Sequence, residues 1–188
     1  MDNAKNQLYE FARELGYFEA CITFESTRLF LEEGFHTRAT FLVRDGREII
    51  GEGTGQRKTT SQIDASTQLL NILFEKHKDL IIDWEQIRIE AQAGDGLIKL
   101  CAYLNNEHST AAKKSFWLQE METDKHMVEI FDRLHAQNDS SVALFGDNLG
   151  AKRKATWIEA LIARRFGSSI ISPSAGKAFE ELIHFLQQ

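Results

Sequence analysis

The sequence has little cysteine and almost no proline. Its 188 residues include two cysteines and one proline, and Cys21 and Cys101 stand far apart without a CxxC partner. This spacing indicates neither a disulfide framework nor a zinc knuckle. We expect both thiols to lie in the core, and Pro173 to lie in a loop before the last helix.

The sequence also lacks a long apolar run and an excess of basic residues. No uninterrupted apolar stretch is long enough to span a bilayer, and residues 1–16 carry charges throughout, with no apolar segment of signal-peptide length. We therefore expect a cytoplasmic protein without a membrane partner. The formal net charge of −6 argues against a generally basic surface, so any contact with RNA or DNA must rest on a local patch.

The first part of the chain alternates between helical and extended patterns. Helical spacing of apolar residues predicts a helix over 4–16, and β-branched and aromatic residues predict strands within 20–34 and over 37–43, separated by a turn at Glu33-Gly34. Asp45-Gly46 is a strong hairpin signal before a third strand over 48–53. Apolar spacing after Gly55 then predicts a helix that ends near Lys76-His77. The order is α-β-β-β-α.

From Trp84 onward the β-branched runs disappear and helical patterns take over. The predicted helical stretches are 97–104, 116–134, 156–166 and 175–186. The fold class is therefore α+β, with an α-β-β-β-α domain over residues 1–78 and an all-helical domain over residues 79–188.

The stretch GEGTGQRKTT, residues 51–60, places three alternating glycines and a basic pair before a predicted helix. One interpretation is that the glycines let the backbone approach a phosphate, which the helix start then holds with Arg57 and Lys58. The other is a strand-to-helix turn whose basic residues form a solvated helix face. The stretch lacks the spacing of a P-loop, and the chain has no nucleophile-elbow sequence.

This order, with a GxG turn and a following basic pair, resembles the double-stranded RNA-binding domain over about residues 4–77. In that family the turn and the helix start span phosphates across a major groove. The resemblance implies RNA contacts at Glu10, within Leu8-Tyr9-Glu10, at His36 and Thr37 in the first strand connection, and at Gly53, Gly55, Arg57 and Lys58.

The chain departs from that pattern in ways that bear on affinity. His36 comes one residue early, and Thr37 occupies the usual histidine position of a loop without its proline. Thr59, Thr60 and Gln62 stand where further cations are expected. Because neutralised phosphates supply much of the affinity for nucleic acid, we expect modest binding.

The helical part of the chain resembles a degenerate ribonuclease III domain. EAQAGDGLIKLCAYL, residues 90–104, is similar to the signature that begins that family's catalytic helix, and TWIEALIARRF, residues 156–166, is similar to its second acidic helix. The resemblance runs from about residue 90 to residue 186. It implies a homodimer through the helical domain and a magnesium site built from four acids, two on each helix.

Only half of those acids are present. Asp95 and Glu159 match the family positions, whereas Ala91 and Thr156 stand at the other two. Glu90 is not expected to substitute, because it lies roughly 140° from Asp95 around a helix, compared with roughly 40° for position 91.

The two retained acids also have structural interpretations. Asp95, after Gly94, could simply cap a helix. Glu159 stands at helical spacing from Ala155, Ile162 and Phe166, an apolar face on which an unpaired acid is costly.

Three functions follow from these observations. The first is binding of double-stranded or structured RNA by a ribonuclease III-related protein with an incomplete catalytic site, and hence without enzymatic activity. The second is a magnesium-dependent endoribonuclease that uses Asp95 and Glu159 with recruited acids such as Glu90. The third is a protein-interaction module. Magnesium at Asp95 and Glu159 is the one cofactor that the resemblance implies.

Overall fold

The computed structural model describes residues 3–29, 34–104, 110–170 and 175–187. The chain divides into two compact units. Unit 1 comprises Met1–Ile82 and Ala143–Leu149, and unit 2 comprises Asp83–Val142 and Gly150–Gln188. Along the described part of the chain, no helix is both long and apolar enough to span a membrane.

Unit 1 has the predicted α-β-β-β-α order around a three-stranded antiparallel sheet. Its elements are α1 (Ala4–Glu14), β1 (Ile22–Leu29), β2 (Gly34–Leu42), β3 (Glu48–Gly55) and α2 (Lys58–Lys76), with short 3-10 turns at Glu19–Cys21 and Lys78–Leu80. The sheet order is β1-β2-β3. The predicted hairpin is confirmed, and Gly46 in its turn has a φ of +89°. Glu33 of the other predicted turn lies outside the described residues.

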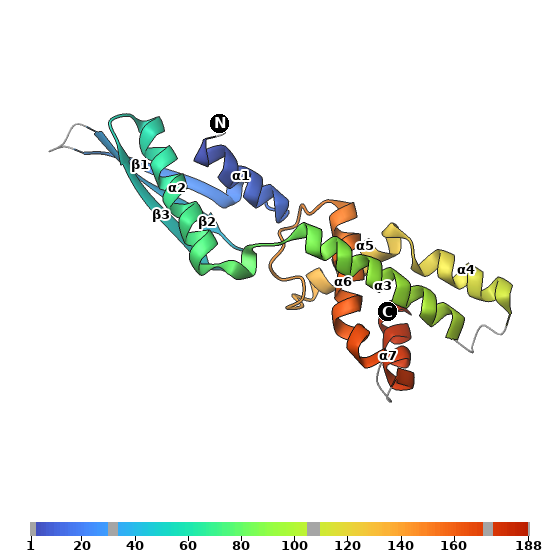
Figure 1. The fold of residues 1–188 in the computed structure, drawn as a ribbon. Coiled ribbons are helices and arrows are strands. Elements are labelled where there is room, and N and C mark those ends of the chain that lie inside the picture. The colour runs from blue at the N-terminus through green and yellow to red at the C-terminus, as the bar shows by residue number, and fades with distance from the viewer. Residues whose placement is uncertain (1–2, 30–33, 105–109, 171–174, 188) are drawn as a thin grey trace. The chain divides into compact units, whose positions relative to one another are not determined.

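Both helices of unit 1 pack beside the sheet, with α2 lying along the strands (Figure 1). Alternation along the strands buries one sheet face under the helices and leaves the other facing solvent. The side chains that fill this core include Leu8, Ala12, Phe41, Ile49, Leu69 and Leu73.

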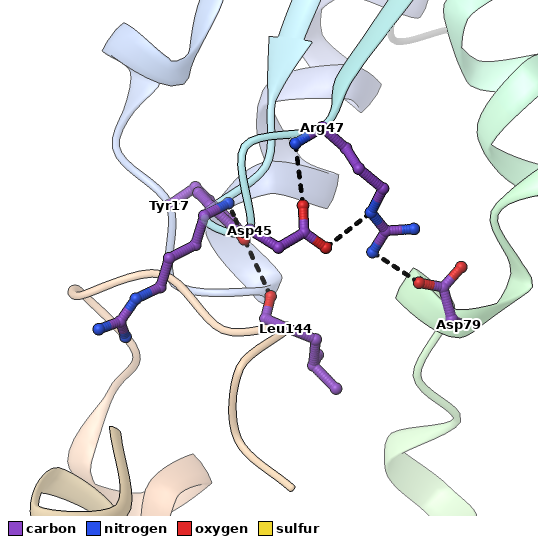
Figure 2. A network of polar contacts seen from close by, with 6 residues as sticks. Tyr17, Asp45, Arg47, Asp79 and Leu144 are labelled. Atoms are coloured by element: carbon purple, nitrogen blue, oxygen red, sulfur yellow. Dashed lines mark hydrogen bonds and ion pairs between the residues drawn. The ribbon is translucent and has the colours of Figure 1, made fainter. Parts of the chain in front are cut away.

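A segment from much later in the sequence completes unit 1. The amides of Gly146 and Asn148 donate hydrogen bonds to the carbonyl oxygens of Leu15 and Gly16, at 2.9 and 2.8 Å. The Tyr17 hydroxyl accepts a hydrogen bond from the amide of Arg44 and donates one to the carbonyl oxygen of Leu144. Figure 2 shows the contact between Tyr17 and Leu144. Residues 143–149 therefore pack as part of the α-β-β-β-α unit.

Unit 2 is helical, as predicted. Its helices are α3 (Trp84–Leu104), α4 (Ala111–Met121), α5 (Asp124–Ala136), α6 (Ala151–Ile170) and α7 (Ala175–Gln187). The prediction of a helical stretch over 116–134 is wrong if it is taken as one helix, because α4 ends at Met121 and Thr123 is the N-cap of α5. The Thr123 hydroxyl donates to the carbonyl oxygen of Glu120 and accepts from the amide of His126, both at 3.1 Å.

The core of unit 2 lies between α3 and α6, which pack against each other, with α5 and α7 against α6 (Figure 1). Its fully buried side chains include Ile98, Met127, Phe131, Ile158 and Leu182. Cys101 is buried here as predicted, and burial raises the pKa of its thiol to about 12. Cys21 in unit 1 is only half-buried.

Candidate functional site

The start of α2 presents the predicted basic pair to solvent. Arg57 is the N-cap residue and Lys58 opens the helix, and both are exposed. The side chain of Arg57 makes no capping hydrogen bond to this end of α2. The amides of a helix start carry partial positive charge, so a cation pair at such an end favours an anion.

A third cation, which the sequence interpretation missed, reaches the same helix. The ammonium of Lys5 on α1 donates a hydrogen bond to the side-chain oxygen of Gln62 at 3.1 Å and lies 4.7 Å from the Phe24 ring centroid. Lys58 and Gln62 are four residues apart and share one face of α2. The double-stranded RNA-binding pattern leads us to expect a cation at position 62 of α2. In this chain position 62 is Gln, and Lys5 of α1 brings positive charge to it.

The three alternating glycines serve packing between the strand and the helix. Gly51, Gly53 and Gly55 lie within β3, directly before the short connection through Gln56 and Arg57 to α2. A Cβ at Gly53 would lie 2.8 Å from the Cα of Ala65, and a Cβ at Gly55 would lie 2.7 Å from the amide nitrogen of Ser61. Glycine here lets the backbone of α2 approach the backbone of β3.

Thr37 is fully buried, which does not fit a direct contact with RNA. Its hydroxyl lies 2.9 Å from that of Ser26 and 2.7 Å from that of Ser61, and the Ser61 hydroxyl donates to the carbonyl oxygen of Lys58. Because Ser61 gives its proton to Lys58, Thr37 donates to Ser61 and accepts from Ser26. This chain of hydroxyls joins the sheet to the first turn of α2 and positions Lys58.

His36 and Glu10 are not brought to this cation cluster by any described contact. Successive strand residues point to opposite faces, so His36 lies on the solvent face of the sheet, opposite Thr37. Its ring nitrogen is 3.8 Å from the carboxylate of Glu52 on β3. Glu10 is exposed on α1, roughly 200° around the helix from the buried Leu8.

In unit 2 the structure brings Asp95 and Glu159 together. A Cβ added at Gly94 would lie 2.7 Å from the carbonyl carbon of Glu159, so α3 and α6 touch through their backbones at this point. Asp95 follows directly and is half-exposed in the middle of α3. The capping interpretation of Asp95 is wrong, because α3 begins at Trp84, where Asp83 accepts hydrogen bonds from the amides of Glu85 and Gln86.

The electrostatic environment of Glu159 is unusual for an acid. The pKa of Glu159 is raised to about 7, first by burial and then by the negative charges of Asp95 and Asp124, against the opposing charges of Lys99 and Lys152. Asp124, at the start of α5, was not foreseen, because nothing in its spacing links it to α3 or α6. Glu159 is therefore a mixture of acid and carboxylate near neutral pH.

The donor set does not suit a magnesium ion. Lys99 donates to the Asp95 carboxylate at 2.6 Å, so a built-in cation already neutralises one of the two predicted ligands. Glu90 is held by Arg164 at 2.5 Å and by Gln86 at 3.1 Å. Within the described ranges, no group of three or more His, Cys, Asp or Glu side chains is arranged to hold a metal. Magnesium prefers an octahedral oxygen shell with charged ligands, which this arrangement does not offer.

Comparison with protein families, curated proteins and solved structures found no match to this chain.

Proposed function

We propose that this chain binds double-stranded or structured RNA through the start of α2, and that its helical unit is a non-catalytic relative of ribonuclease III. The observation that carries the proposal is the cluster of Lys5, Arg57 and Lys58 at the N-terminal end of α2. The α-β-β-β-α order of unit 1 supports it, because double-stranded RNA-binding domains read A-form shape with this order of elements.

The net charge limits how strongly this surface binds. With a charge of −6 over the chain, long-range attraction to nucleic acid is weak, and affinity depends on the few phosphates that the cluster neutralises. The proposal therefore predicts modest affinity that falls steeply with salt.

Fluorescence anisotropy with a duplex RNA longer than about 16 base pairs, the span of such domains, tests the proposal. We expect tighter binding to the RNA than to a DNA duplex of the same sequence. Arg57→Ala with Lys58→Ala should weaken RNA binding strongly. The matched control, Lys76→Ala with Lys78→Ala, removes the same charge at the other end of α2 and should bind like wild type.

Three results would count against this surface. Equal affinity for RNA and DNA would argue against recognition of A-form shape. Wild-type binding by the Arg57 and Lys58 variant, with the control also unchanged, would place the RNA elsewhere. Absence of any binding would favour the protein-interaction module.

The convergence of Asp95 and Glu159 supports a second candidate function, a magnesium-dependent endoribonuclease. Gly94 brings the two helices together where the family places its acids, and Glu159 can hold or release a proton near pH 7. The Lys99 ion pair favours the non-catalytic alternative. Incubating the same duplex RNA with and without magnesium separates the two, since only the nuclease shortens it.

The exposed apolar side chains of unit 2 support the homodimer implied by the resemblance. Leu100, Tyr103 and Leu104 share a face of α3, and Phe116 is exposed on α4, whose Lys114 donates to the carbonyl oxygen of Tyr103. Exposed apolar groups that cluster in this way are typical of interfaces. Light scattering should show a dimer that Leu104→Lys weakens, whereas Phe18→Lys, at an exposed position of unit 1, should not.

A further inference from the structure

Unit 2 contains a cavity that neither the cation cluster nor the acidic pair uses. It has a volume of about 330 Å³ and lies where the end of α5, the second half of α6 and the last turns of α7 meet. This volume is within the range of small-ligand sites.

The cavity has an apolar, largely aromatic floor. Leu134, Phe166 and Phe185 line it and are nearly buried, with exposed fractions of 8%, 4% and 8%. The two phenyl rings are 6.0 Å apart between centroids and tilted by 53°. Such a floor accepts a flat apolar or aromatic group.

Two arginines supply positive charge at this cavity. Arg133 comes from α5 and Arg165 from α6. The Arg165 guanidinium lies 5.7 Å from the centroids of both Phe166 and Phe185. A guanidinium held against aromatic rings keeps its in-plane N–H groups available for an anion such as a phosphate.

The acids that line the cavity have other partners. Asp139 accepts hydrogen bonds from the amide and hydroxyl of Ser141, at 2.8 and 2.6 Å, and these bonds lower the pKa of its carboxyl, with Arg165 adding to the effect. Glu181 lies 3.7 Å from the ammonium of Lys177. Among the residues that the structure describes, neither Arg133 nor Arg165 has an ion pair with a carboxylate.

We propose that this cavity binds a phosphomonoester that carries an aromatic ring, such as a mononucleotide, with the ring on the Phe166 and Phe185 floor and the phosphate on Arg133 and Arg165. Guanidinium groups bind phosphate through paired, charge-assisted hydrogen bonds. The site lies wholly within unit 2, so it is independent of the RNA surface proposed on α2.

Isothermal titration calorimetry of the full chain with adenosine monophosphate tests the site. We expect measurable binding, with adenosine and inorganic phosphate each at least about tenfold weaker, because each uses only half of the site. Arg165→Gln, at an exposed position, should weaken adenosine monophosphate binding by about tenfold or more, since it removes a charged hydrogen-bonding partner. Arg133→Gln should do the same.

The matched control is Arg88→Gln. Arg88 is an exposed arginine of α3 that pairs with Glu85 and does not line the cavity, so this variant should bind adenosine monophosphate as wild type does. Thermal unfolding confirms that each variant is folded. Failure of adenosine monophosphate to bind folded wild-type protein at millimolar concentration overturns the proposal. So does undiminished binding by the folded Arg133 and Arg165 variants, or inorganic phosphate binding as tightly as the nucleotide.

The phosphomonoester can be free or can be the 5′ end of a strand. Short single-stranded RNAs with a 5′-phosphate or a 5′-hydroxyl distinguish these sources, measured in the Arg57→Ala, Lys58→Ala background so that α2 does not contribute. Tighter binding of the phosphorylated strand that Arg165→Gln abolishes assigns a strand end. Binding of adenosine monophosphate alone assigns a free nucleotide, and both results uphold the site.

Discussion

The Tyr17 hydroxyl donates a hydrogen bond to the carbonyl oxygen of Leu144 at 3.0 Å, across 127 positions of sequence (Figure 2). The Tyr17 hydroxyl oxygen also accepts a hydrogen bond from the amide of Arg44, at 3.1 Å. One buried side chain therefore joins the end of α1, the β2–β3 hairpin and the returning segment 143–149. Burial raises the pKa of Tyr17, so the phenol remains protonated and able to donate.

Tyr17→Phe should destabilise unit 1 by about 1–3 kcal/mol, because it leaves an amide and a carbonyl without their partner. Amide hydrogen exchange should show faster exchange at Arg44, Gly146 and Asn148. Tyr9→Phe is the control, since Tyr9 packs edge-on against Phe24 with no described hydrogen bond of its hydroxyl. If these amides exchange at the same rate in Tyr17→Phe and Tyr9→Phe, the Tyr17 hydroxyl does not hold residues 143–149 in place.

The order of elements in unit 1 was predictable because it rests on local signals. Alternating apolar residues, the Asp45-Gly46 turn and the helical spacing after Gly55 act over a few residues each. The return of residues 143–149 depends on backbone hydrogen bonds to Leu15 and Gly16, which leave no periodic pattern in the sequence. For the same reason Lys5 was missed, since its partner Gln62 is 57 positions away.

The candidate sites were predictable only in part. The positions of Arg57 and Lys58 at a helix start follow from the local sequence, whereas the burial of Thr37 depends on hydroxyls from β1 and α2. The proximity of Asp95 and Glu159 was inferred from a resemblance, and the structure shows its physical basis in Gly94. The lysine that neutralises Asp95 stands one turn later on the same helix and could have been identified from its i,i+4 spacing.

Two glycines of α3 provide a matched test of the contact between α3 and α6. Gly94→Ala should destabilise unit 2 by about 1–3 kcal/mol, because the new methyl group meets the backbone of Glu159. A Cβ at Gly96 would have no described heavy atom within 4 Å, so Gly96→Ala should stabilise unit 2 by about 0.5–1 kcal/mol through the higher helix propensity of alanine. Chemical unfolding followed by tryptophan fluorescence reports on unit 2, since all three tryptophans lie in it. Equal effects of the two substitutions would contradict the close backbone contact.

Lys5→Ala should weaken binding to duplex RNA and lower the slope of log affinity against log salt by about 0.9, the value for one neutralised phosphate of a duplex. Lys5 contacts Gln62 on the face that also carries Lys58, so its loss should resemble part of the Arg57 and Lys58 effect. Lys125→Ala, an exposed lysine of α5, is the control. An unchanged salt slope would remove Lys5 from the RNA surface.

Glu159 should make the stability of unit 2 depend on pH between about 4.5 and about 7. Its pKa in the folded protein, about 7, is above the unfolded value of 4.5, so the folded state prefers the neutral acid. The resulting stability is fully present below pH 4.5 and is lost as pH rises through 7. Glu159→Gln should therefore raise the melting temperature at pH 8 more than at pH 5. If Glu159→Gln changes the melting temperature equally at pH 5 and at pH 8, the pKa of Glu159 is not raised.

The last prediction concerns the incomplete acidic site. Ala91 is 5% exposed and Thr156 is half-buried, so introducing acids there adds charge to a partly buried cluster that already contains Asp95 and Glu159. Ala91→Glu with Thr156→Asp should therefore lower the stability of unit 2 in the absence of a divalent cation. Magnesium should restore little of that stability while Lys99 still neutralises Asp95.

Adding Lys99→Ala to these two substitutions should let magnesium restore the stability of unit 2, because it frees the Asp95 carboxylate from its ion pair. The melting temperature of this triple variant should rise with millimolar magnesium, since a cation that binds only the folded state stabilises it. Wild type should show neither this shift nor magnesium-dependent cleavage of duplex RNA. Rapid wild-type cleavage that Asp95→Asn or Glu159→Gln abolishes would instead establish the endoribonuclease, with Lys99 displaced from Asp95 when the metal and the RNA bind.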